Sequence, residues 1–466
     1  MTTGPDWYAG RHVVVGGAGV SGAAVTTALL NLGARVTVVD RVASPGLEAL
    51  TATGAAVLVD PTDLPRDADQ VVVSPGWRPS NPLLAAPLAA GIEVFSEPEL
   101  AWRLRPPGAA PWLAVTGTNG KTTTVTVLAT ILGAAGLRTA AVGNIGVPLI
   151  DAVLAAEPYD VLAVELSSYQ LHWSSTLAPA AAALLNLADD HLDWHGGFDA
   201  YVAAKARLWR SASTVAIGNA EDPRVAALLA AAPGRRVGFS LHTPAPGQFG
   251  VVEDVLVDRA FTDDPAQATA VGSVGDVEPP GPHNVANALA AAALARSHGV
   301  DPDAVAAGLA AYQPEPHRNA LVRLLGGVRW VDDSKATNPH AAEASLRAYP
   351  KVVWVAGGQL KGVDIGPLVA AVADRLAGAV LLGVDRGEIA TALARHAPHV
   401  PVREVLRADD GAMTEVVAAA VALARPGDTV LLAPAAASLD MFASYAARGH
   451  AFATAVEQLA APPLAG

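Results

Sequence analysis

The sequence predicts an α/β protein with mostly parallel sheets and three domains. Short apolar runs alternate with longer alanine-rich stretches along the whole chain, which is the pattern of stacked βα units. The length of 466 residues corresponds to about three domains at roughly 150 residues each. Two proline-rich breaks, at 105–111 and 313–317, separate the candidate domains. We therefore place the domains at 1–106, 107–315 and 316–466.

Apolar runs bounded by polar or glycine-rich segments are the predicted strands. They are residues 12–15, 36–39, 70–73, 113–115, 161–164, 183–187, 328–331, 352–355, 379–384 and 429–432. Residues 125–137 are predicted to be helical, and residues 251–280, rich in Asp, Gly and Pro, to form short strands and loops. No period of about 20 to 50 residues recurs, which excludes a solenoid.

Composition excludes several classes of protein. The formal net charge of −13 disfavours nucleic acid and anionic membranes as partners. The lack of cysteine excludes disulfides and thiol chemistry and is compatible with a reducing cytosol. The longest uncharged stretch, 166–188, is interrupted by polar residues and Pro179, unlike a spanning helix of about 20 apolar residues. The N-terminus has no basic region followed by an apolar run. We expect a cytoplasmic monomer without membrane insertion.

A glycine fingerprint follows the first predicted strand. Gly17, Gly19 and Gly22 form G-x-G-x-x-G, and Asp40 ends the next strand, about 20 residues on, where a ribose-binding acid is expected in a Rossmann-like domain. Alone, this pattern indicates NAD. The alternative is a tight βα turn without a ligand, because an isolated glycine fingerprint has low specificity.

The most specific motif is a second glycine loop, Thr116-Gly117-Thr118-Asn119-Gly120-Lys121-Thr122-Thr123, between a predicted strand and a predicted helix. In such a loop, backbone amides and the helix dipole hold phosphates, the lysine reaches the outer phosphates, and the Thr hydroxyl holds Mg²⁺. Four of the five lysines, Lys121, Lys205, Lys335 and Lys361, lie in or beside clusters of small polar residues. Lysine is a compact cation that suits such sites. The motif predicts nucleoside triphosphate binding.

Acidic and histidine residues follow two other central strands. Glu165 ends the strand 161–164, where a buried carboxylate needs a cation such as Mg²⁺, although a solvated glutamate is the alternative. His191, Asp193 and His195 are compatible with zinc, but without cysteine and beside a nucleotide a role in binding Mg²⁺ or Mn²⁺ is favoured for His191. Lys205, taken by its local sequence alone, is interpreted as a solvated helix lysine.

Polar residues also gather in the last third of the chain. Asn284 and Asn287 lie one turn apart at a helix start, where they either hold an adenine edge or cap the helix. Arg318 follows the second domain break, where it can reach a phosphate as domains close. Residues 332–339, 357–362 and 433–440 each begin where a strand ends, so they should line one edge of the last sheet. This edge predicts a small polar substrate.

Taken in order, these motifs resemble the Mur ligase family over essentially the whole chain. The resemblance implies a Rossmann-like first domain without a redox cofactor, a central P-loop-type ATPase domain and a Rossmann-like last domain. It is strongest to the members that join D-glutamate to UDP-N-acetylmuramoyl-L-alanine through an acyl phosphate. These members act in cytoplasmic peptidoglycan precursor synthesis, and hence in cell wall biogenesis, cell shape and cell division.

The family also implies roles for individual residues, with ATP and two Mg²⁺ ions, or Mn²⁺, as cofactors. ATP is expected at Gly117, Thr118, Asn119, Gly120, Lys121, Thr122, Thr123, Asn287, Arg318 and Asp333. The implied metal ligands are Thr122, Glu165, His191 and a carbamylated Lys205; Lys121, Glu165, His191 and Lys205 are the catalytic group. UDP-N-acetylmuramoyl-L-alanine is expected at Val20, Ser21, Asp40, Arg41, Gly76, Asn144, Ser167 and Gln170. Glutamate is expected at Lys335, Thr337, Lys361, Ser438, Leu439 and Tyr445.

Some positions depart from the family pattern. Arg41 and Val42 replace small polar and basic residues, and Tyr445 replaces a frequent Phe. Sister ligases for L-alanine, a diamino acid or a dipeptide remain alternatives. So do a regulatory ATPase that ligates nothing and an NAD-dependent dehydrogenase, although the latter leaves the phosphate loop unexplained. Folylpolyglutamate synthetases share only the last two domains.

Overall fold

The computed structural model describes residues 4–262, 264, 266–314, 316–409 and 411–459. The chain forms three sheets and divides into two compact units. Unit 1 comprises Met1–Asp276 and Ala286–Tyr312, and unit 2 comprises Val277–Val285 and Gln313–Gly466. The predicted boundary at 315 lies outside the described residues.

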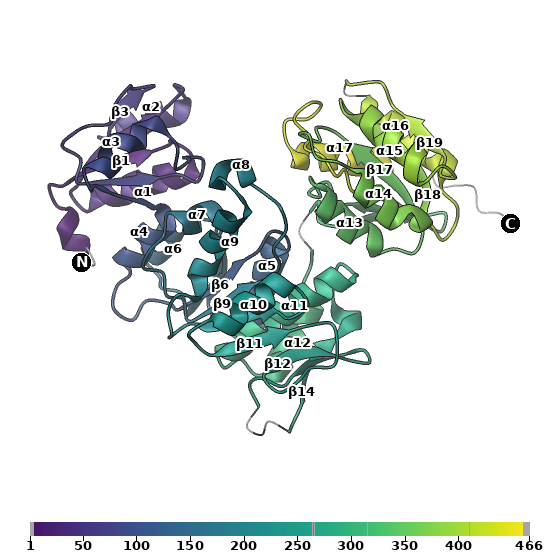
Figure 1. Ribbon diagram of the computed structural model, residues 1–466, viewed down its shortest axis with the longest axis horizontal. Helices are drawn as coiled ribbons and strands as arrows, with labels where there is room; N and C mark the ends of the chain where they lie inside the picture. Colours follow the sequence, from purple (N-terminus) through teal and green to yellow (C-terminus); the bar gives the residue numbers. More distant parts are fainter. Residues whose placement is uncertain (1–3, 263, 265, 315, 410, 460–466) are drawn as a thin grey trace. The chain divides into compact units, whose positions relative to one another are not determined.

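The N-terminal sheet is parallel, in the order β3-β2-β1-β4-β5. Its strands are β1 (His12–Gly16), β2 (Arg35–Asp40), β3 (Ala56–Val59), β4 (Gln70–Val73) and β5 (Glu93–Ser96). Its helices are α1 (Val20–Asn31), α2 (Pro45–Ala52), α3 (Ala85–Ala89) and α4 (Glu97–Leu104), shown in purple and blue in Figure 1. The strand order reverses between β1 and β4, where open α/β sheets bind ligands at the carboxyl ends of the strands.

The central sheet has nine strands in the order β14-β13-β12-β11-β10-β9-β6-β8-β7. They are β6 (Trp112–Thr116), β7 (Thr139–Gly143), β8 (Val161–Glu165), β9 (Ala181–Leu184), β10 (Val215–Asn219), β11 (Arg236–Phe239), β12 (Gln248–Val252), β13 (Val255–Asp258) and β14 (Thr269–Ser273). The helices are α5 (Lys121–Ala134), α6 (Leu149–Val153), α7 (Ser168–His172), α8 (Leu192–His195), α9 (Phe198–Ala206), α10 (Pro223–Ala231), α11 (Pro282–Ser297) and α12 (Pro302–Ala311). Only the β12-β13-β14 end is antiparallel.

The C-terminal sheet has the order β15-β16-β20-β17-β18-β19, with β15 antiparallel to β16. Its strands are β15 (Ala320–Leu325), β16 (Val328–Asp332), β17 (Val352–Gly357), β18 (Leu376–Leu382), β19 (Val402–Glu404) and β20 (Thr429–Leu432). Two buried apolar clusters cover its two faces, since the successive β17 residues Trp354 and Val355 belong to different clusters. The helices are α13 (Pro339–Arg347), α14 (Gly366–Val372), α15 (Arg386–His396), α16 (Ala412–Leu423) and α17 (Tyr445–Glu457).

The predicted strands all exist, and 70–73 and 429–432 match β4 and β20 at both ends. Two predictions were wrong at their boundaries: β9 ends at Leu184 rather than 187, and β18 is Leu376–Leu382 rather than 379–384. In both cases apolar residues continue into the strand-end loop, so hydrophobicity alone does not mark the end. The predicted helix at 125–137 begins earlier, at Lys121, as α5.

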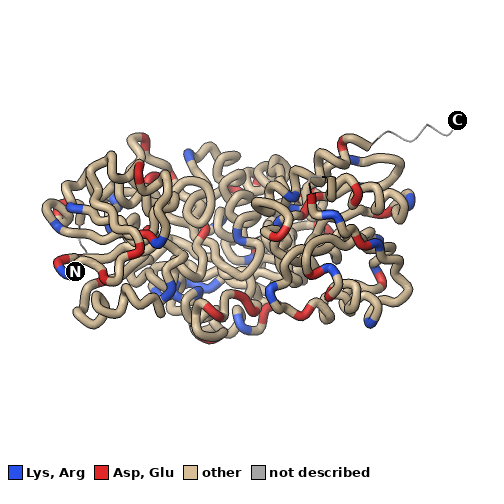
Figure 2. Tube along the Cα trace, turned by 90° about the horizontal axis from the view of Figure 1, so that it is seen from above, with Lys and Arg blue, Asp and Glu red and all other residues tan. Residues whose placement is uncertain are grey.

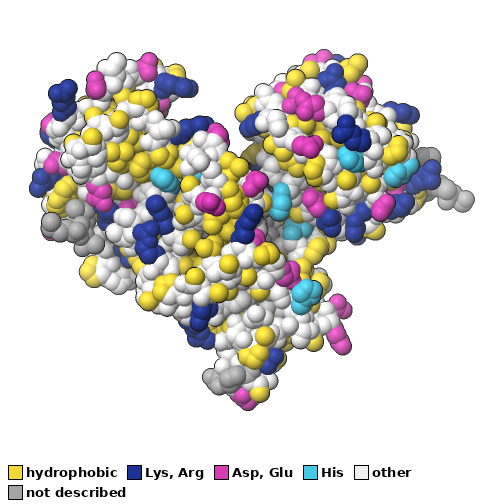
Figure 3. Space-filling view, in the orientation of Figure 1, with side chains coloured by type: hydrophobic (Ala, Val, Ile, Leu, Met, Phe, Trp, Pro, Cys, Tyr) yellow, Lys and Arg dark blue, Asp and Glu magenta, His cyan; other side chains and the backbone are white. Residues whose placement is uncertain are grey.

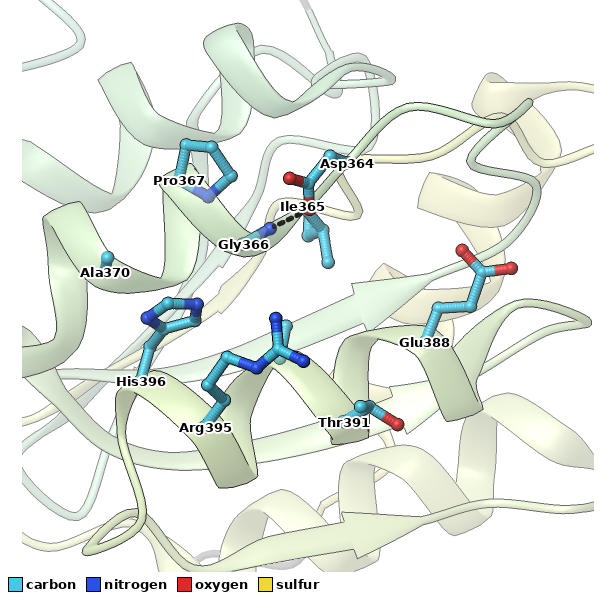
Figure 4. Close-up of a pocket in the computed structure, with 10 residues that line it drawn as sticks. Asp364, Ile365, Gly366, Pro367, Ala370, Glu388, Thr391, Arg395 and His396 are labelled. Atoms are coloured by element: carbon cyan, nitrogen blue, oxygen red, sulfur yellow. Dashed lines mark hydrogen bonds between the residues drawn. The ribbon is translucent and has the colours of Figure 1, made fainter.

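The surface is mixed in character. Figure 2 shows basic and acidic residues interspersed along the trace, and Figure 3 shows charged side chains among hydrophobic ones on the face in view. Within the described ranges, no helix is both long and apolar enough to cross a membrane. An open pocket of about 420 Å³ lies between the start of α14 and α15, and its polar lining includes Asp364, Glu388, Arg395 and His396 (Figure 4). None of the predicted site residues lines it.

Candidate active site

The phosphate loop connects β6, which lies between β9 and β8 in the nine-stranded sheet, to α5. Gly117 and Gly120 have positive φ of 157° and 83°, a conformation that L side chains rarely adopt. A Cβ on Gly120 would also collide with the side-chain oxygen of Asn287. Glycine is therefore required at 120 both by the backbone turn and by the close approach of Asn287, one of the predicted ATP-binding residues.

Lys121 is folded over this loop. Its Nζ donates to the carbonyl oxygens of Gly117 at 3.0 Å and Thr118 at 2.8 Å. The ammonium group thus lies on the loop where a bound phosphate would have its negative charge. It is the first residue of α5, so the positive end of the helix dipole contributes to the same place.

Two residues that we did not assign to the site hold the loop from outside. Asn186 accepts from the amide of Asn119 at 2.9 Å and donates to the carbonyl oxygen of the same residue at 3.1 Å. The hydroxyls of Tyr201 and Thr118 are 2.8 Å apart. Asn186 is a polar residue near the end of the predicted strand 183–187, which was a usable signal, whereas Tyr201 has no local pattern that indicates its partner.

Glu165 lies at the carboxyl end of β8 and is 1% exposed. Its Oε2 accepts from the hydroxyl of Thr122 at 2.7 Å, and its Oε1 accepts from the side-chain amide of Asn144 at 2.8 Å. The structure therefore brings together a predicted metal ligand from α5, one from β8 and a predicted muramoyl contact from the loop after β7. The alternative of a solvated Glu165 was wrong.

Lys205 is buried at the end of α9, with 2% exposure, so the interpretation as a solvated helix lysine was also wrong. Its Nζ donates to the carbonyl oxygen of Gly117 at 2.7 Å. Burial lowers the pKa of Lys205 well below its usual value, and the charge of Lys121 acts in the same direction. A buried amine with a lowered pKa is more often neutral. The neutral amine is the form that reacts with carbon dioxide, as the predicted carbamylation of Lys205 requires.

His191 immediately precedes α8 and has a positive φ of 53°. Its ring lies 4.8 Å from that of Tyr169, and its Nε2 is 3.3 Å from an oxygen of Asp190. Burial lowers the pKa of His191, and Lys121 and Lys205 add to this effect against the opposing charge of Asp190. These influences place His191 in the same electrostatic environment as the two lysines.

The zinc alternative does not fit. His195 Nε2 is 3.0 Å from the hydroxyl of Ser168, and burial lowers the pKa of His195 to about 4. Across the residues that the structure covers, no group of three or more His, Asp or Glu side chains could hold a metal ion. Thr122 and Glu165, by contrast, present oxygen atoms of the kind that Mg²⁺ takes together with phosphates and water.

The predicted muramoyl and uridine contacts lie in two places in unit 1. Ser167 and Gln170 form a capping box at the start of α7, where Gln170 Oε1 accepts from the amide of Ser167 at 2.9 Å. Asp40 accepts from the amides of Ala18 at 2.8 Å and Arg41 at 2.7 Å, so this carboxylate supports the first glycine turn. Val20, Arg41 and Gly76 are exposed around that turn, and Ser21 is partly buried.

Unit 2 contains the predicted glutamate residues and two predicted ATP contacts. Lys335, Thr337, Lys361, Ser438 and Leu439 lie in the three loops that follow β16, β17 and β20. Lys335 Nζ is 4.0 Å from the ring centre of Tyr445 at the start of α17. The loops that sequence analysis expected at one sheet edge are thus at the carboxyl ends of adjacent strands.

Arg318 is partly buried, whereas Asp333 is enclosed. Asp333 accepts from the amide of Asn319 at 3.0 Å and from the hydroxyl of Ser345. Burial raises the pKa of Asp333 to about 7. The carboxyl group is therefore part of a buried hydrogen-bond network within unit 2.

Arg448 of α17, 1% exposed, is the main residue that sequence analysis missed. Its Nη1 donates to the carbonyl oxygens of Gly357 at 3.2 Å and Ala436 at 3.1 Å. Its Nε and Nη2 donate to the hydroxyl and carbonyl oxygens of Ser334 at 2.9 and 3.0 Å. One guanidinium therefore connects all three loops. The following Gly449, where a Cβ would collide with His317, was the only local signal of such close packing.

Comparison with known proteins places this site in a family. A UDP-N-acetylmuramoylalanine–D-glutamate ligase of Thermobifida fusca is 59% identical over 464 residues, covering 97% of this chain and 99% of the relative. The chain belongs to the Mur ligase family. Models of the Mur ligase MurD-like N-terminal domain, the Mur ligase middle domain and the Mur ligase glutamate ligase domain match residues 11–96, 115–295 and 317–436.

Further relatives agree with this assignment. The equally named ligase of Streptomyces avermitilis is 55% identical, covering 98% of this chain and all of the relative. Among solved structures, MurF from Acinetobacter baumannii is similar with a TM-score of 0.59 and 19% identity, covering 94% of this chain and 88% of that chain. At that identity the structural similarity supports the three-domain α/β fold of Mur ligases and nothing finer.

Proposed function

We infer that this chain is an ATP-dependent, ADP-forming ligase that joins D-glutamate to UDP-N-acetylmuramoyl-L-alanine in peptidoglycan precursor synthesis. The observation that carries this function is the identity to relatives of that name, 59% and 55% over almost the whole of both chains. The site supports the same chemistry, because Lys121, Thr122 and Glu165 form one cluster at the phosphate loop.

The reaction proceeds in two steps. A carboxylate oxygen of the muramoyl substrate attacks the γ-phosphorus of ATP, which forms an acyl phosphate and releases ADP. The amine of glutamate then attacks the acyl carbon, loses a proton, and expels inorganic phosphate from a tetrahedral intermediate to leave an amide. The protein performs little covalent chemistry in such a reaction, so charge neutralisation and positioning dominate. Lys121, beside the loop carbonyls, is suited to neutralise the transferring phosphate.

Two Mg²⁺ ions, or Mn²⁺, are part of the proposal. Thr122 and Glu165 would hold one ion, and Glu165, His191 and a carbamylated Lys205 the other. Bound there, the ions would neutralise phosphate charge as the transfer occurs. The lowered pKa of the buried Lys205 amine supports carbamylation, because the neutral amine is the reactive form. The modification would place a carboxylate-like oxygen donor on a side chain that otherwise has none.

The remaining assignments divide the substrates among the domains, with boundaries at about 106 and 315. The uridine diphosphate end would lie at the first glycine turn, near Val20, Asp40 and Gly76. Asn144, whose side-chain amide donates to Glu165, would contact the muramoyl part of the substrate. The muramoyl part would then lie near the proposed metal ligands. Lys335 and Lys361 would pair with the carboxylates of glutamate, since opposite charges form the stronger hydrogen bonds.

The cellular setting follows from the reaction. We propose a cytoplasmic monomer that contributes to cell wall formation and, through it, to cell shape and division. Elution volume with multi-angle scattering tests the monomer, and depletion of the protein in growing cells tests the cellular role by accumulation of the UDP-linked substrate.

The decisive experiment measures phosphate release with ATP and Mg²⁺. D-glutamate, L-glutamate, L-alanine and a diamino acid are compared, each with and without UDP-N-acetylmuramoyl-L-alanine. Turnover that requires both D-glutamate and the UDP substrate is expected. Preference for L-alanine or a diamino acid would move the chain to a sister ligase, and phosphate release without any amino acid would indicate an ATPase.

A further inference from the structure

The loop after β4, residues 74–78, contacts the first glycine turn on one side. A Cβ on Gly16 would lie 2.6 Å from a ring carbon of Trp77, so the indole packs directly on the end of β1. On the other side, the carbonyl oxygen of Trp77 accepts from the indole nitrogen of Trp173, which follows α7, at 3.2 Å. Trp77 therefore contacts both the N-terminal sheet and the central domain, and both lie within unit 1.

The next residue, Arg78, reaches α8. Its guanidinium donates to an oxygen of Asp193 at 2.7 Å. The helix α8 has four residues and follows His191 directly. A helix this short is not stable by itself, because its few hydrogen bonds do not offset the cost of ordering the chain. The position of His191 therefore depends on the tertiary contacts that hold α8.

Further contacts of α8 come from the N-terminal sheet and from α7. Trp194, 7% exposed, belongs to a buried cluster with Val14, Val71 and Val73 of the N-terminal sheet, and Trp77 packs against this cluster. The ring of Trp194 also lies 4.6 Å from that of Tyr169 in α7. The short helix is thus packed between the N-terminal sheet and α7.

We propose that Trp77 and Arg78 are positioning residues that hold α8 and thereby set the place of His191. They act through Trp194 and Asp193 and touch no reacting atom. Because Gly76 directly precedes Trp77, a uridine nucleotide bound at Gly76 and a metal bound at His191 share this contact and are coupled. The inference rests on the proposed function, which assigns Gly76 to the uridine end of the substrate and His191 to a metal.

The coupling is reciprocal. A nucleotide that raises the affinity for the metal must have its own affinity raised by the metal by the same factor. The Arg78–Asp193 pair is half exposed or more on both sides, at 50% and 72%, so its share of the effect is small. The partly buried indole of Trp77, which packs against the cluster of Trp194, carries the larger share, since truncating a packed aromatic side chain costs more than losing an exposed ion pair.

The test is a titration of the full chain with Mn²⁺, followed by electron paramagnetic resonance, in the presence of a non-hydrolysable ATP analogue and with or without UDP. Arg78→Ala should weaken Mn²⁺ binding by about two- to fivefold, the size expected for an exposed ion pair. Arg78→Lys should largely restore it. Trp77→Ala should weaken Mn²⁺ binding by on the order of tenfold and reduce the effect of UDP. Arg66→Ala, an exposed arginine of the same domain, is the matched control and should match the wild type.

A double variant separates positioning from general damage. If Arg78 acts through Asp193, Arg78→Ala with Asp193→Ala should bind Mn²⁺ no more weakly than either single variant. Wild-type Mn²⁺ affinity in both Trp77→Ala and Arg78→Ala overturns the inference, even if their thermal midpoints fall. Failure of the proposed function looks different: the wild type then binds Mn²⁺ with nucleotide but releases no phosphate with D-glutamate.

Discussion

Two glycine-rich turns in unit 1 have the same local design and different surroundings. In both, a buried parallel strand is followed by glycine with positive φ and then by a helix: Gly17 lies between β1 and α1, and Gly117 and Gly120 lie between β6 and α5. A turn of this kind presents backbone amides at a helix N-terminus, which suits an anion. From the backbone alone, both turns would be nucleotide sites of equal standing.

The side chains that converge on each turn make the difference. At the first turn, the carboxylate of Asp40 accepts from the amide of Ala18, and the indole of Trp77 covers Gly16. At the second, the ammonium of Lys121 lies on the loop, and the side-chain amide of Asn287 closely approaches Gly120. Directly after the loop, the hydroxyl of Thr122 donates to the carboxylate of Glu165. A cation and a hydroxyl–carboxylate pair are what phosphoryl transfer needs, so only the second turn is equipped for chemistry.

The largest expected effect is at Lys121. Lys121→Arg should lower ligation by at least about a hundredfold although the charge is kept, because a larger planar group would displace its donors within a tight loop. Phosphate release at saturating substrates measures it. Lys351→Arg, the same change at an exposed lysine, should be neutral. Turnover of Lys121→Arg near that of the wild type would remove the distinction between the two turns.

Lys205→Ala should be nearly as damaging, with a loss on the order of a hundredfold, because a metal-ligating oxygen would be missing from the second turn. High acetate should restore part of the activity by supplying a carboxylate to the cavity. Lys205→Arg, which cannot be carbamylated, should not be restored by acetate. A high-resolution map with substrate and Mg²⁺ that shows an unmodified lysine would contradict the carbamate.

A third glycine-rich strand end, after β17 in unit 2, extends the comparison to the amino acid. Lys361 there has a positive φ of 55°. Lys361→Ala should raise the Michaelis constant for D-glutamate by at least about tenfold, the size of a lost charge-assisted hydrogen bond. The constants for ATP and the UDP substrate should change by less than about threefold. A uniform rise in all three constants would indicate a damaged domain instead of a lost glutamate contact.

Alanine at one glycine of each turn separates stability from catalysis. A Cβ on Gly22 would collide with the carbonyl oxygen of Gly17, so Gly22→Ala should lower the free energy of unfolding by about 1–3 kcal/mol. In Gly120→Ala, the new Cβ would collide with Asn287 and the residue would have to adopt a positive φ. This change should raise the Michaelis constant for ATP by about tenfold. Gly76→Ala, with open space around its Cβ, is the stability control. The ranking comes from urea unfolding and steady-state kinetics, and the reverse pattern would contradict it.

The smallest expected effect concerns NAD. The first turn should bind UDP and not NAD, since Asp40 is already engaged with two backbone amides and the first turn is not a hydride-transfer site in the proposed reaction. Calorimetry of the whole chain compares the two ligands. Micromolar NAD binding that UDP does not displace would return the first turn to the ordinary Rossmann interpretation.

Most of the fold could be predicted from sequence, since parallel strands buried on both faces are near-continuous apolar runs between glycine-rich turns. The phosphate loop could be predicted for a similar reason. Its glycines, Lys121 and Thr122 are neighbours in the chain, so one short segment specifies both the backbone and the chemistry. The role of Glu165 could be predicted from sequence because a charged residue that ends a buried strand needs a partner.

Tertiary structure decided which distant side chains meet. Nothing local in the sequence around Lys205 indicates that its ammonium reaches Gly117, or that the amide of Asn144 meets Glu165. Arg448 illustrates the same point, since the ends of three strands meet its guanidinium only after the sheet has formed. Local patterns reflect hydrogen bonding and burial within one element, whereas the pairing of charges depends on strand order and packing, which bring together residues far apart in the chain.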